Sequence, residues 1–306
     1  MGITRAPTAA VYTALFGGYE QLNEAQEQGD GSVPFICFTD DIALRSSVWD
    51  VRLVAPLFAA DLQRSQRDIK IRGHRDLDQF ERTLYIDNSV SLMGPPSEVL
   101  DDWLRDDPIA IPAHSYREAV LDEFRAVLEI GLDDSARVHE QLHHYSTYFP
   151  EILEQRPYWG GMIARRRSPE VAETMNRWFD EVCRYSRRDQ LSANVVFSQS
   201  PIRPRAVEID NHGSSAHRWP VSVGRKSPES AFGSHRTLPN LAREQVLDGE
   251  VRELRRELSA LRQTEQALRQ TEHALAQAIQ EMHSSRSWRI TAPLRRLRSL
   301  GRKEQL

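Results

Sequence analysis

The sequence predicts an α/β fold with a mainly parallel sheet flanked by helices, followed by a C-terminal coiled-coil helix. Short apolar runs bounded by Gly, Pro or Asp alternate with longer segments of helical periodicity through most of the chain. A heptad pattern of leucines then replaces this alternation. No stretch of the 306 residues is apolar for long enough to span a bilayer.

The strand candidates share β-branched or aromatic residues and turn-forming borders. They are residues 9–16, 33–39, 49–55, 82–90 and 108–113. Helical spacing marks residues 96–105, 117–131 and 168–186. The last helix has Ser168 as its N-cap and Pro169 in its first turn. Strands that alternate with helices favour a sheet covered on both faces.

The chain is expected to contain four parts. These are a globular domain at 8–223, a linker at 224–240, a coiled coil at 241–283 and a basic amphipathic tail at 284–306. The heptad places Glu265 and Glu272 at inner positions, where they weaken a dimer or select a partner or register. We expect self-association or association with another protein through this segment. The alternative is a single solvated helix lying on the domain.

Composition restricts the partners. The formal net charge of −4 argues against bulk nucleic-acid binding. Between Arg286 and Lys303, however, basic residues occur without acidic ones, and this stretch is a candidate for contact with an anionic membrane surface. The alternative is a solvated basic tail. Cys37 and Cys183 are expected to be buried, reduced thiols. We therefore expect a cytoplasmic protein that can be peripheral at the inner face of the membrane.

The first strand ends in a turn of small residues that could approach a ligand closely. Gly17 and Gly18 form this turn, and Tyr12 and Thr13 precede it as candidate contacts to a nucleotide. A tight turn without a ligand explains the same pattern. At the end of the second strand candidate, Asp40 and Asp41 could hold a ribose or a base edge, or cap the next segment.

A dense cluster of cations precedes the strand candidate at 82–90. Arg64, Arg67, Lys70 and His74 are its candidate ligands for a diphosphate, because guanidinium and ammonium groups donate to phosphate oxygens. About half of such a run is expected merely to face water.

Asp87 ends an apolar strand and is the candidate for holding the diphosphate through a divalent cation, Mn²⁺ or Mg²⁺. Asp-x-Asp is the usual device for this purpose. The triplet here is Asp87-Asn88-Ser89, so the second carboxylate of this device is missing. His212, on a late loop, is a minority candidate for completing a metal shell.

Three further segments are candidates for the acceptor or the transferred sugar. Trp159, Gly160 and Gly161 could form a wall on which a sugar stacks, or a bulge packed by tryptophan. Asp189 either caps a helix or lies in the site. Arg188 and Gln190 flank Asp189 as further candidates. The third segment carries His114, Arg117 and Glu123. The spacing of Arg117 and Glu123 excludes a simple helical ion pair, so they either meet other parts of the site or are unrelated surface charges.

Together and in order, these motifs resemble a known family. The matching pieces are VYTALFGGY, ICFTDD with the following Trp49, the array from Arg64 to His74, YID at 85–87, His114-x-x-Arg117 with Glu123, and RDQLS at 188–192. They are similar to the glycosyltransferase-like family called domain of unknown function 616, whose plant members are linked to cell-wall and mucilage polysaccharides. That family is similar in turn to GT-A (Rossmann-like) enzymes such as the glycogenin-like transferases.

The resemblance implies a GT-A-like domain that moves a sugar from a nucleotide-diphosphate sugar, for which UDP is our guess, to a surface-glycan or related acceptor. It implies a nucleotide sugar at the first strand and the TDD segment, with Asp87 and Asp189 as catalytic candidates. The tail is similar to tails of bacterial surface-polysaccharide enzymes. One alternative is a ceramidase-like hydrolase of the same family, using His114, His212 and His217. Another is a non-catalytic binding module with a coiled-coil scaffold.

Overall fold

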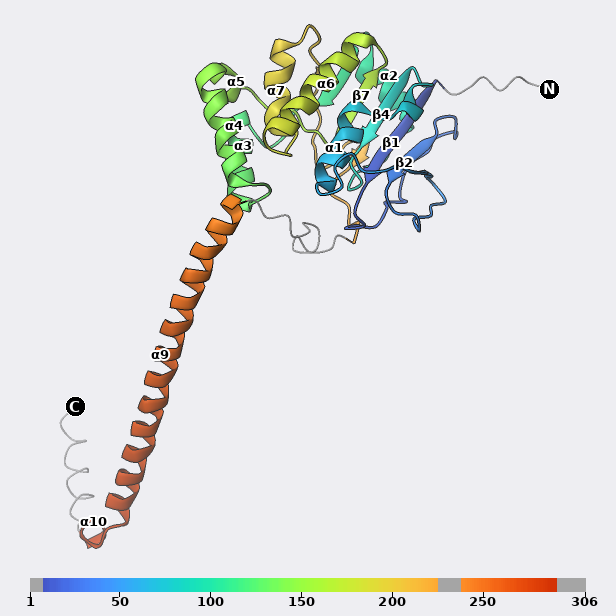
Figure 1. Cartoon of the computed structure of the whole chain (residues 1–306). Coiled ribbons are helices and arrows are strands. Elements are labelled where there is room, and N and C mark those ends of the chain that lie inside the picture. The colour runs from blue at the N-terminus through green and yellow to red at the C-terminus, as the bar shows by residue number, and fades with distance from the viewer. Residues whose placement is uncertain (1–7, 225–237, 291–306) are drawn as a thin grey trace, which may run out of the picture. The chain divides into compact units, whose positions relative to one another are not determined.

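A computed structural model of the chain describes residues 8–224 and 238–290 (Figure 1). The chain divides into two units between residues 235 and 236, and the first unit holds the sheet. No helix among the described residues is both long and apolar enough to cross a membrane.

The main sheet has seven strands in the order β3-β2-β1-β4-β7-β6-β8. They are β1 (Ala9–Leu15), β2 (Phe35–Thr39), β3 (Asp50–Leu53), β4 (Arg82–Ile86), β6 (Ile109–Pro112), β7 (Met162–Arg166) and β8 (Arg205–Val207). Two short strands, β5 (Ser91–Leu92) and β9 (His217–Arg218), pair separately.

Most neighbouring strands of the main sheet are parallel, which confirms the predicted α/β fold class. β1 pairs in parallel with β2 and β4, β2 with β3, and β6 with β8. β7 runs antiparallel to both β4 and β6. The start of β7 therefore lies at the same edge of the sheet as the carboxyl ends of β1, β4 and β6.

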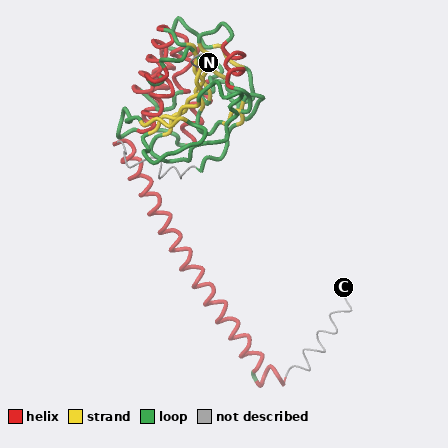
Figure 2. The backbone as a smooth tube through the Cα atoms, turned by 90° about the vertical axis from the view of Figure 1, so that its right-hand side faces the viewer, coloured by secondary structure: helices red, strands yellow, loops and turns green. Residues whose placement is uncertain are grey.

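Helices cover both faces of the sheet, and Figure 2 shows most of them to one side of the strands. On that face lie α1 (Leu62–Arg72), α6 (Pro169–Arg184) and α7 (Gln190–Gln199), packed on Tyr12 and Tyr85. The other face packs Val11 and Leu84 against α2 (Pro96–Leu104). Successive side chains of β1 and β4 thus point into the cores on opposite faces of the sheet, because side chains alternate along a strand.

A third cluster of buried side chains lies beside the sheet. It joins α7 to α3 (Val120–Ile130), α4 (Ser135–Tyr148) and α5 (Pro150–Leu153). A short 3₁₀ turn, Arg75–Leu77, follows α1. The whole insertion from β6 to β7 therefore has a core of its own, and we call residues 113–161 the inserted lobe.

Two details show where local sequence patterns succeeded and failed. The helix expected at 168–186 forms with Ser168 accepting from the N–H of Val171, and its apolar stripe is buried. Cys37 is buried as expected, whereas Cys183 is exposed, which corrects our expectation. Cys183 follows the buried Val182 in α6. Neighbouring residues of a helix point in different directions, and Cys183 points to solvent.

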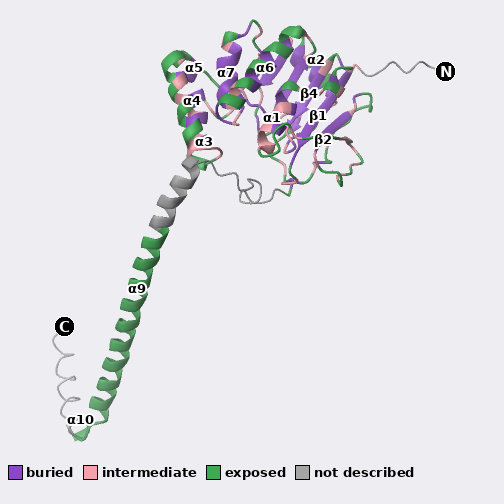
Figure 3. Ribbon diagram, in the orientation of Figure 1, coloured by how far each residue is buried: buried purple, intermediate pink, exposed green. Residues whose placement is uncertain are grey.

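The second unit contains α9 (Leu238–Ser284) and α10 (Arg286–Ile290). α9 begins slightly before the expected coiled coil, and residues 225–237 of the expected linker lie outside the described residues. The heptad side chains from Val251 to Met282 are 43 to 67% exposed, and Figure 3 shows the helix exposed along the part where burial is described. Residues 291–306, most of the expected basic tail, lie outside the described residues, so membrane contact stays a prediction.

Candidate functional site

A cavity of about 490 Å³ lies at the sheet edge where β1 and β4 end. Ala14 represents β1 in its wall, and Asp87 follows β4 directly. This is the edge at which open α/β sheets bind ligands. The polar side chains that line it are Tyr19, Glu20, Gln66, Arg67, Asp87, Asn88, Ser89, Arg188, Gln190 and Ser222.

Lys70 and two carboxylates form the centre of the polar network behind this cavity. The ammonium of Lys70 lies 2.7 Å from Asp189 Oδ2 and 3.5 Å from Asp87 Oδ1. Lys70 is only 2% exposed at its side chain, whereas Asp87 keeps 30% of its side chain accessible. A buried ammonium without such partners would carry a large desolvation penalty. The two aspartates therefore hold the Lys70 side chain in place behind the cavity.

Neighbouring residues of α1 extend the network. Arg67 Nε lies 3.0 Å from Asp189 Oδ1, and the Gln66 side-chain amide donates to the Tyr85 hydroxyl at 2.6 Å. The Tyr85 hydroxyl donates in turn to Asp87 Oδ1, also at 2.6 Å. Asp87 thus has one oxygen held by Tyr85 and Lys70. These contacts preorganise the carboxylate before any ligand arrives.

Asp189 is ionised and inaccessible. Its side chain is 2% exposed. Burial alone would raise the pKa of Asp189, but the charges of Lys70 and Arg67 outweigh burial and hold this pKa well below its usual range. A carboxylate of such low basicity is a poor proton acceptor near neutral pH. Asp189 therefore pairs with Lys70 and Arg67, and it is not among the residues that line the cavity.

Gly160 and Gly161 allow the backbone to approach this network. A Cβ on Gly160 would lie 3.1 Å from both Asp189 Oδ2 and Lys70 Nζ. A Cβ on Gly161 would overlap the ring of Trp159, and Gly161 offers its carbonyl to the N–H of Asp87 at 2.8 Å. Trp159 lines the cavity while packing into the sheet core. Trp159 and Gly161 thus form a close-packed part of the cavity wall, and Gly160 lies against the ion network behind it.

Arg188 and Gln190 flank Asp189 and both line the cavity. The Gln190 amide donates to the Tyr158 carbonyl at 3.3 Å. Arg188 Nε is buried without a hydrogen-bond partner among the described residues. Because Arg188 also lines the cavity, the other N–H groups of its guanidinium are potential donors to an anionic ligand there.

The predicted nucleotide contacts of the first two strands are not at this cavity. Tyr12 and Thr13 are fully buried, and the Tyr12 hydroxyl donates to the Lys70 carbonyl at 2.8 Å. Gly17 and Gly18 have positive φ, as the tight turn requires. Asp40 Oδ1 accepts from the Gly17 N–H at 2.9 Å. Tyr12 and Thr13 belong to the core, and the glycines form a turn outside the cavity wall.

Asp40 and Asp41 act as turn caps. Asp41 Oδ1 accepts from the N–H of Ala43 at 2.8 Å, and neither aspartate lines the cavity. The structure therefore favours the capping alternative for this pair over a contact to ribose.

The predicted cation array is split between different surroundings. Arg67 and Lys70 belong to the network described above, but Arg64 donates from Nε to the Val182 carbonyl at 3.0 Å and so holds the end of α6. His74 lies beyond the helix, where its Nδ1 accepts from the N–H of Asp76. A step of three residues along an α-helix falls about 60° short of a full turn. Arg64 and Lys70 are two such steps apart, so their side chains point in different directions.

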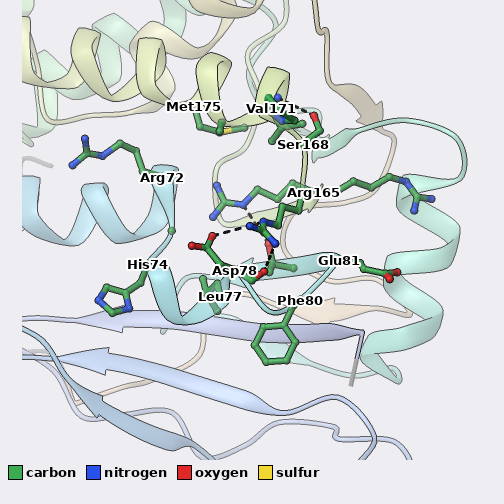
Figure 4. Close-up of a pocket in the computed structure, with 16 residues that line it drawn as sticks. Arg72, His74, Leu77, Asp78, Phe80, Glu81, Arg165, Ser168, Val171 and Met175 are labelled. Carbon is green, nitrogen blue, oxygen red and sulfur yellow. Dashed lines mark hydrogen bonds and ion pairs between the residues drawn. The ribbon is translucent and has the colours of Figure 1, made fainter. Parts of the chain in front are cut away.

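His74 lines a second cavity, of about 520 Å³, at the opposite end of β4 (Figure 4). Thr83 near the start of β4 and Arg165 near the end of β7 also line it. The Arg165 guanidinium hydrogen-bonds within the protein, because it donates to the Ile71 carbonyl and the Tyr12 hydroxyl. His74 is thus remote from Asp87, and the predicted array does not converge on one ligand.

His114 and Arg117 meet around Glu123, next to the cavity but not in its wall. Arg117 Nε lies 3.4 Å and His114 Nε2 3.8 Å from Glu123 Oε2. Burial, followed by the charges of Arg117, Arg156 and His212, lowers the pKa of His114 to about 4. His114 is therefore neutral at physiological pH. The sequence spacing of Arg117 and Glu123 had excluded a simple helical pair, and the structure pairs them because Arg117 precedes α3.

The residues present fit a divalent cation poorly. The described residues contain no group of three or more carboxylate, imidazole or thiol side chains placed to hold a metal ion. Asp87 is approached by Lys70 on one oxygen, and Ser89 stands where a second aspartate would be expected. His212 lies against Tyr116 and Trp219 instead of Asp87. His217 is bound to Asn211 and Ser214, so the three histidines of the hydrolase alternative form no metal group.

Several cavity residues had no sequence signal. Ser89 accepts from the Trp219 indole at 3.2 Å, and Asn88 ties the turn at Glu20 and Gln21 to the end of β4. Asn88 and Ser89 adjoin Asp87, so adjacency could have suggested them. Trp219 reaches the cavity from far along the chain, and only the fold brings it there.

Comparison with known proteins adds a family. The model of the TOD1/MUCI70 glycosyltransferase-like domain matches residues 3–209. The probable hexosyltransferase MUCI70 of Arabidopsis thaliana is 26% identical over 211 residues, which are 61% of this chain and 36% of that protein. The chain therefore spans little more than a third of the length of this curated relative.

Two solved structures share 10% identity with the chain. The apo structure of the bifunctional glycosyltransferase WbbM has a TM-score of 0.43 and covers 68% of this chain and 40% of its own. The apo form of mouse xyloside xylosyltransferase 1 has a TM-score of 0.38, with coverages of 64% and 84%. Likenesses of this degree carry no argument about activity.

Proposed function

Because the chain belongs to the TOD1/MUCI70 glycosyltransferase-like family, we propose that it transfers a hexosyl group from a nucleotide-diphosphate sugar to a glycan acceptor. The fold would then be of the GT-A type. The observation that carries the proposal is the cavity at the ends of β1 and β4, with Asp87 and two arginines in its wall. We take UDP as the first donor nucleotide to test.

The cavity cations would bind the diphosphate. Arg188 has an unused buried N–H, and Arg67 lies between Asp189 and the cavity. Guanidinium groups suit phosphate oxygens because they donate two parallel hydrogen bonds. Both groups would stabilise the negative charge that grows on the leaving diphosphate as the bond to the sugar breaks.

Asp87 would orient the donor sugar. Oδ1 is fixed by Tyr85 and Lys70, which leaves the second oxygen of this partly exposed carboxylate for a sugar hydroxyl. Lys70 would offset the charge of Asp87 close to the diphosphate. In this proposal the buried ammonium supplies positive charge that a divalent cation would otherwise provide.

The first test compares Asp87→Asn with Asp41→Asn in a screen of UDP- and GDP-hexoses that follows nucleotide release. The loss of an oriented charge at the reacting sugar is expected to lower kcat/KM by at least about 100-fold in Asp87→Asn. Asp41→Asn is the matched control, because its amide keeps the turn cap outside the cavity. Wild-type turnover by Asp87→Asn would remove Asp87 from the site.

The second test asks whether nucleotide binding needs a metal. UDP is titrated calorimetrically into the protein in EDTA and again in Mn²⁺. The Kd is expected to agree within about twofold, because Arg67, Lys70 and Arg188 bring the positive charge themselves. Binding that disappears in EDTA would show that Asp87 works through a cation.

A further inference from the structure

Three aromatic rings lie together at the mouth of the cavity, and we call Tyr116, His212 and Trp219 the aromatic cluster. The Tyr116 ring is inclined by 23° to His212 and by 13° to Trp219, with centroids 5.0 and 6.4 Å away. His212 and Trp219 are 5.3 Å apart. Trp219 lines the cavity, whereas Tyr116 is 39% exposed and His212 is exposed. The cluster thus runs from the cavity wall out to solvent.

Buried hydrogen bonds hold the cluster in place. Asn211 is fully buried, accepts from the Ser115 N–H at 2.6 Å and donates to the Ala113 carbonyl at 2.9 Å. His217 binds the Asn211 carbonyl with Nε2 at 2.9 Å, and the Trp219 indole donates to Ser89. The loop that carries His212 and Trp219 is thereby fastened to the segment that carries Tyr116. Such a surface loses little entropy when it binds a ligand.

We propose that the aromatic cluster binds a hexopyranose ring of the acceptor glycan, an inference that rests on the proposed transferase function. A pyranose presents C–H groups on one face, which pack on an aromatic ring while the hydroxyls at its edge stay in water. Exposed aromatic rings that continue into a polar cavity match this chemistry. The chain of the acceptor would lie over Tyr116 and His212, with its reacting end at Trp219.

The position in the sheet favours the acceptor over the donor nucleotide. Tyr116 follows the end of β6, which is separated from β4 by β7. The proposed sugar ligand Asp87 directly follows β4, and the proposed phosphate ligand Arg67 lies on α1, which packs on β1. A donor held there would present its sugar toward the aromatic cluster, which leaves the cluster for the second substrate.

The experiment titrates the full chain, with and without UDP, with short linear neutral oligosaccharides of glucose, galactose or mannose. Wild type is expected to bind at least one of them. Tyr116→Ala is expected to lower that affinity about tenfold, and Tyr116→Phe to retain it, because the ring face makes the contact. The affinity for UDP is expected to stay within twofold in both variants. Tyr148→Ala is the matched control, since Tyr148 is an exposed tyrosine on α4, outside the cluster.

Three results would overturn the assignment of the aromatic cluster. One is unchanged oligosaccharide affinity in a Tyr116→Ala protein that melts like wild type. Another is the absence of oligosaccharide binding to wild type. The third is an equal loss of UDP affinity in Tyr116→Ala, which would assign the rings to the nucleotide. Failure of wild type to bind any nucleotide, with oligosaccharide binding intact, would instead count against the proposed transferase function.

Discussion

The ammonium of Lys70 has almost no contact with water and lies between the carboxylates of Asp87 and Asp189. Three charged groups at such distances stabilise one another only as a set, because each would be costly to bury alone. The sequence placed all three among the candidate residues, but it could not assign their partners. Asp189, which we expect near the reacting sugar, contacts Lys70 and Arg67 and is approached closely by Gly160.

Removal of the Asp189 charge should destabilise the fold. We expect Asp189→Asn to lower the free energy of unfolding by about 3–5 kcal/mol, because Lys70 and Arg67 stay buried with too little negative charge beside them. Urea unfolding measures this change. The exposed pair Glu173–Arg177 supplies the control Glu173→Gln, which should cost at most about 1 kcal/mol. Equal unfolding curves for Asp189→Asn and wild type would contradict the role of this ion cluster.

The same prediction has a pH dependence. The folded-state pKa of Asp189 is depressed, so its contribution to stability is fully present above its ordinary value of about 3.9. It is lost as the pH falls from there toward the lower folded-state pKa. The stability gap between wild type and Asp189→Asn should therefore be constant near neutral pH and narrow on acidification below about pH 4.

At the scale of elements, some helices could be predicted from their sequence pattern and others could not. α6 could be predicted because its apolar stripe, N-cap and early proline agree. α1 could not be predicted, because its residues are mostly polar and were interpreted as a cation array. The charged side chains of α1 point from different sides of the helix toward the cavity, α6 and solvent. Which side chain points where can be worked out only when the segment is known to be a helix.

α9 presents an apolar stripe without a partner among the described residues. The stripe occupies both inner positions of the heptad, and the burial of leucines in a paired helix would stabilise it by roughly 1.5–3 kcal/mol per side chain. Glu265 and Glu272 interrupt the stripe and would limit that gain. We therefore propose that the chain self-associates through α9.

Sedimentation of the full chain tests this association. Wild type is expected to form an oligomer, and Leu261→Lys combined with Leu268→Lys is expected to give monomers of lower helicity. The matched control is Gln263→Lys with Gln270→Lys, which adds the same charge on the outer face of the same two heptads. A monomeric wild type, or an oligomer that survives the leucine changes, would exclude self-association through this stripe.

At the scale of the whole molecule, the sequence predicts the fold class but not the order and direction of the strands in the sheet. Alternation of apolar runs and helical segments predicted the α/β fold, and the strand candidates from 9 to 113 all lie on observed strands. The antiparallel direction of β7 had no local signal, because a strand's own residues do not specify the direction of its neighbour. For the same reason, the meeting of Asp87 with Trp219 and Arg188 could not be anticipated, since the fold alone joins these segments.

The inserted lobe leaves the sheet after β6 and re-enters it at β7, where Trp159 and Gly161 line the cavity. Its buried residues pack mainly against one another and α7, so its length and surface can vary while the strand order is conserved. An engineered chain in which only α3, α4 and α5 (residues 120–153) are exchanged would keep Gly160, Gly161 and the Lys70 ion cluster. For the proposed transferase, exchange of these three helices is therefore the most direct way to change the acceptor.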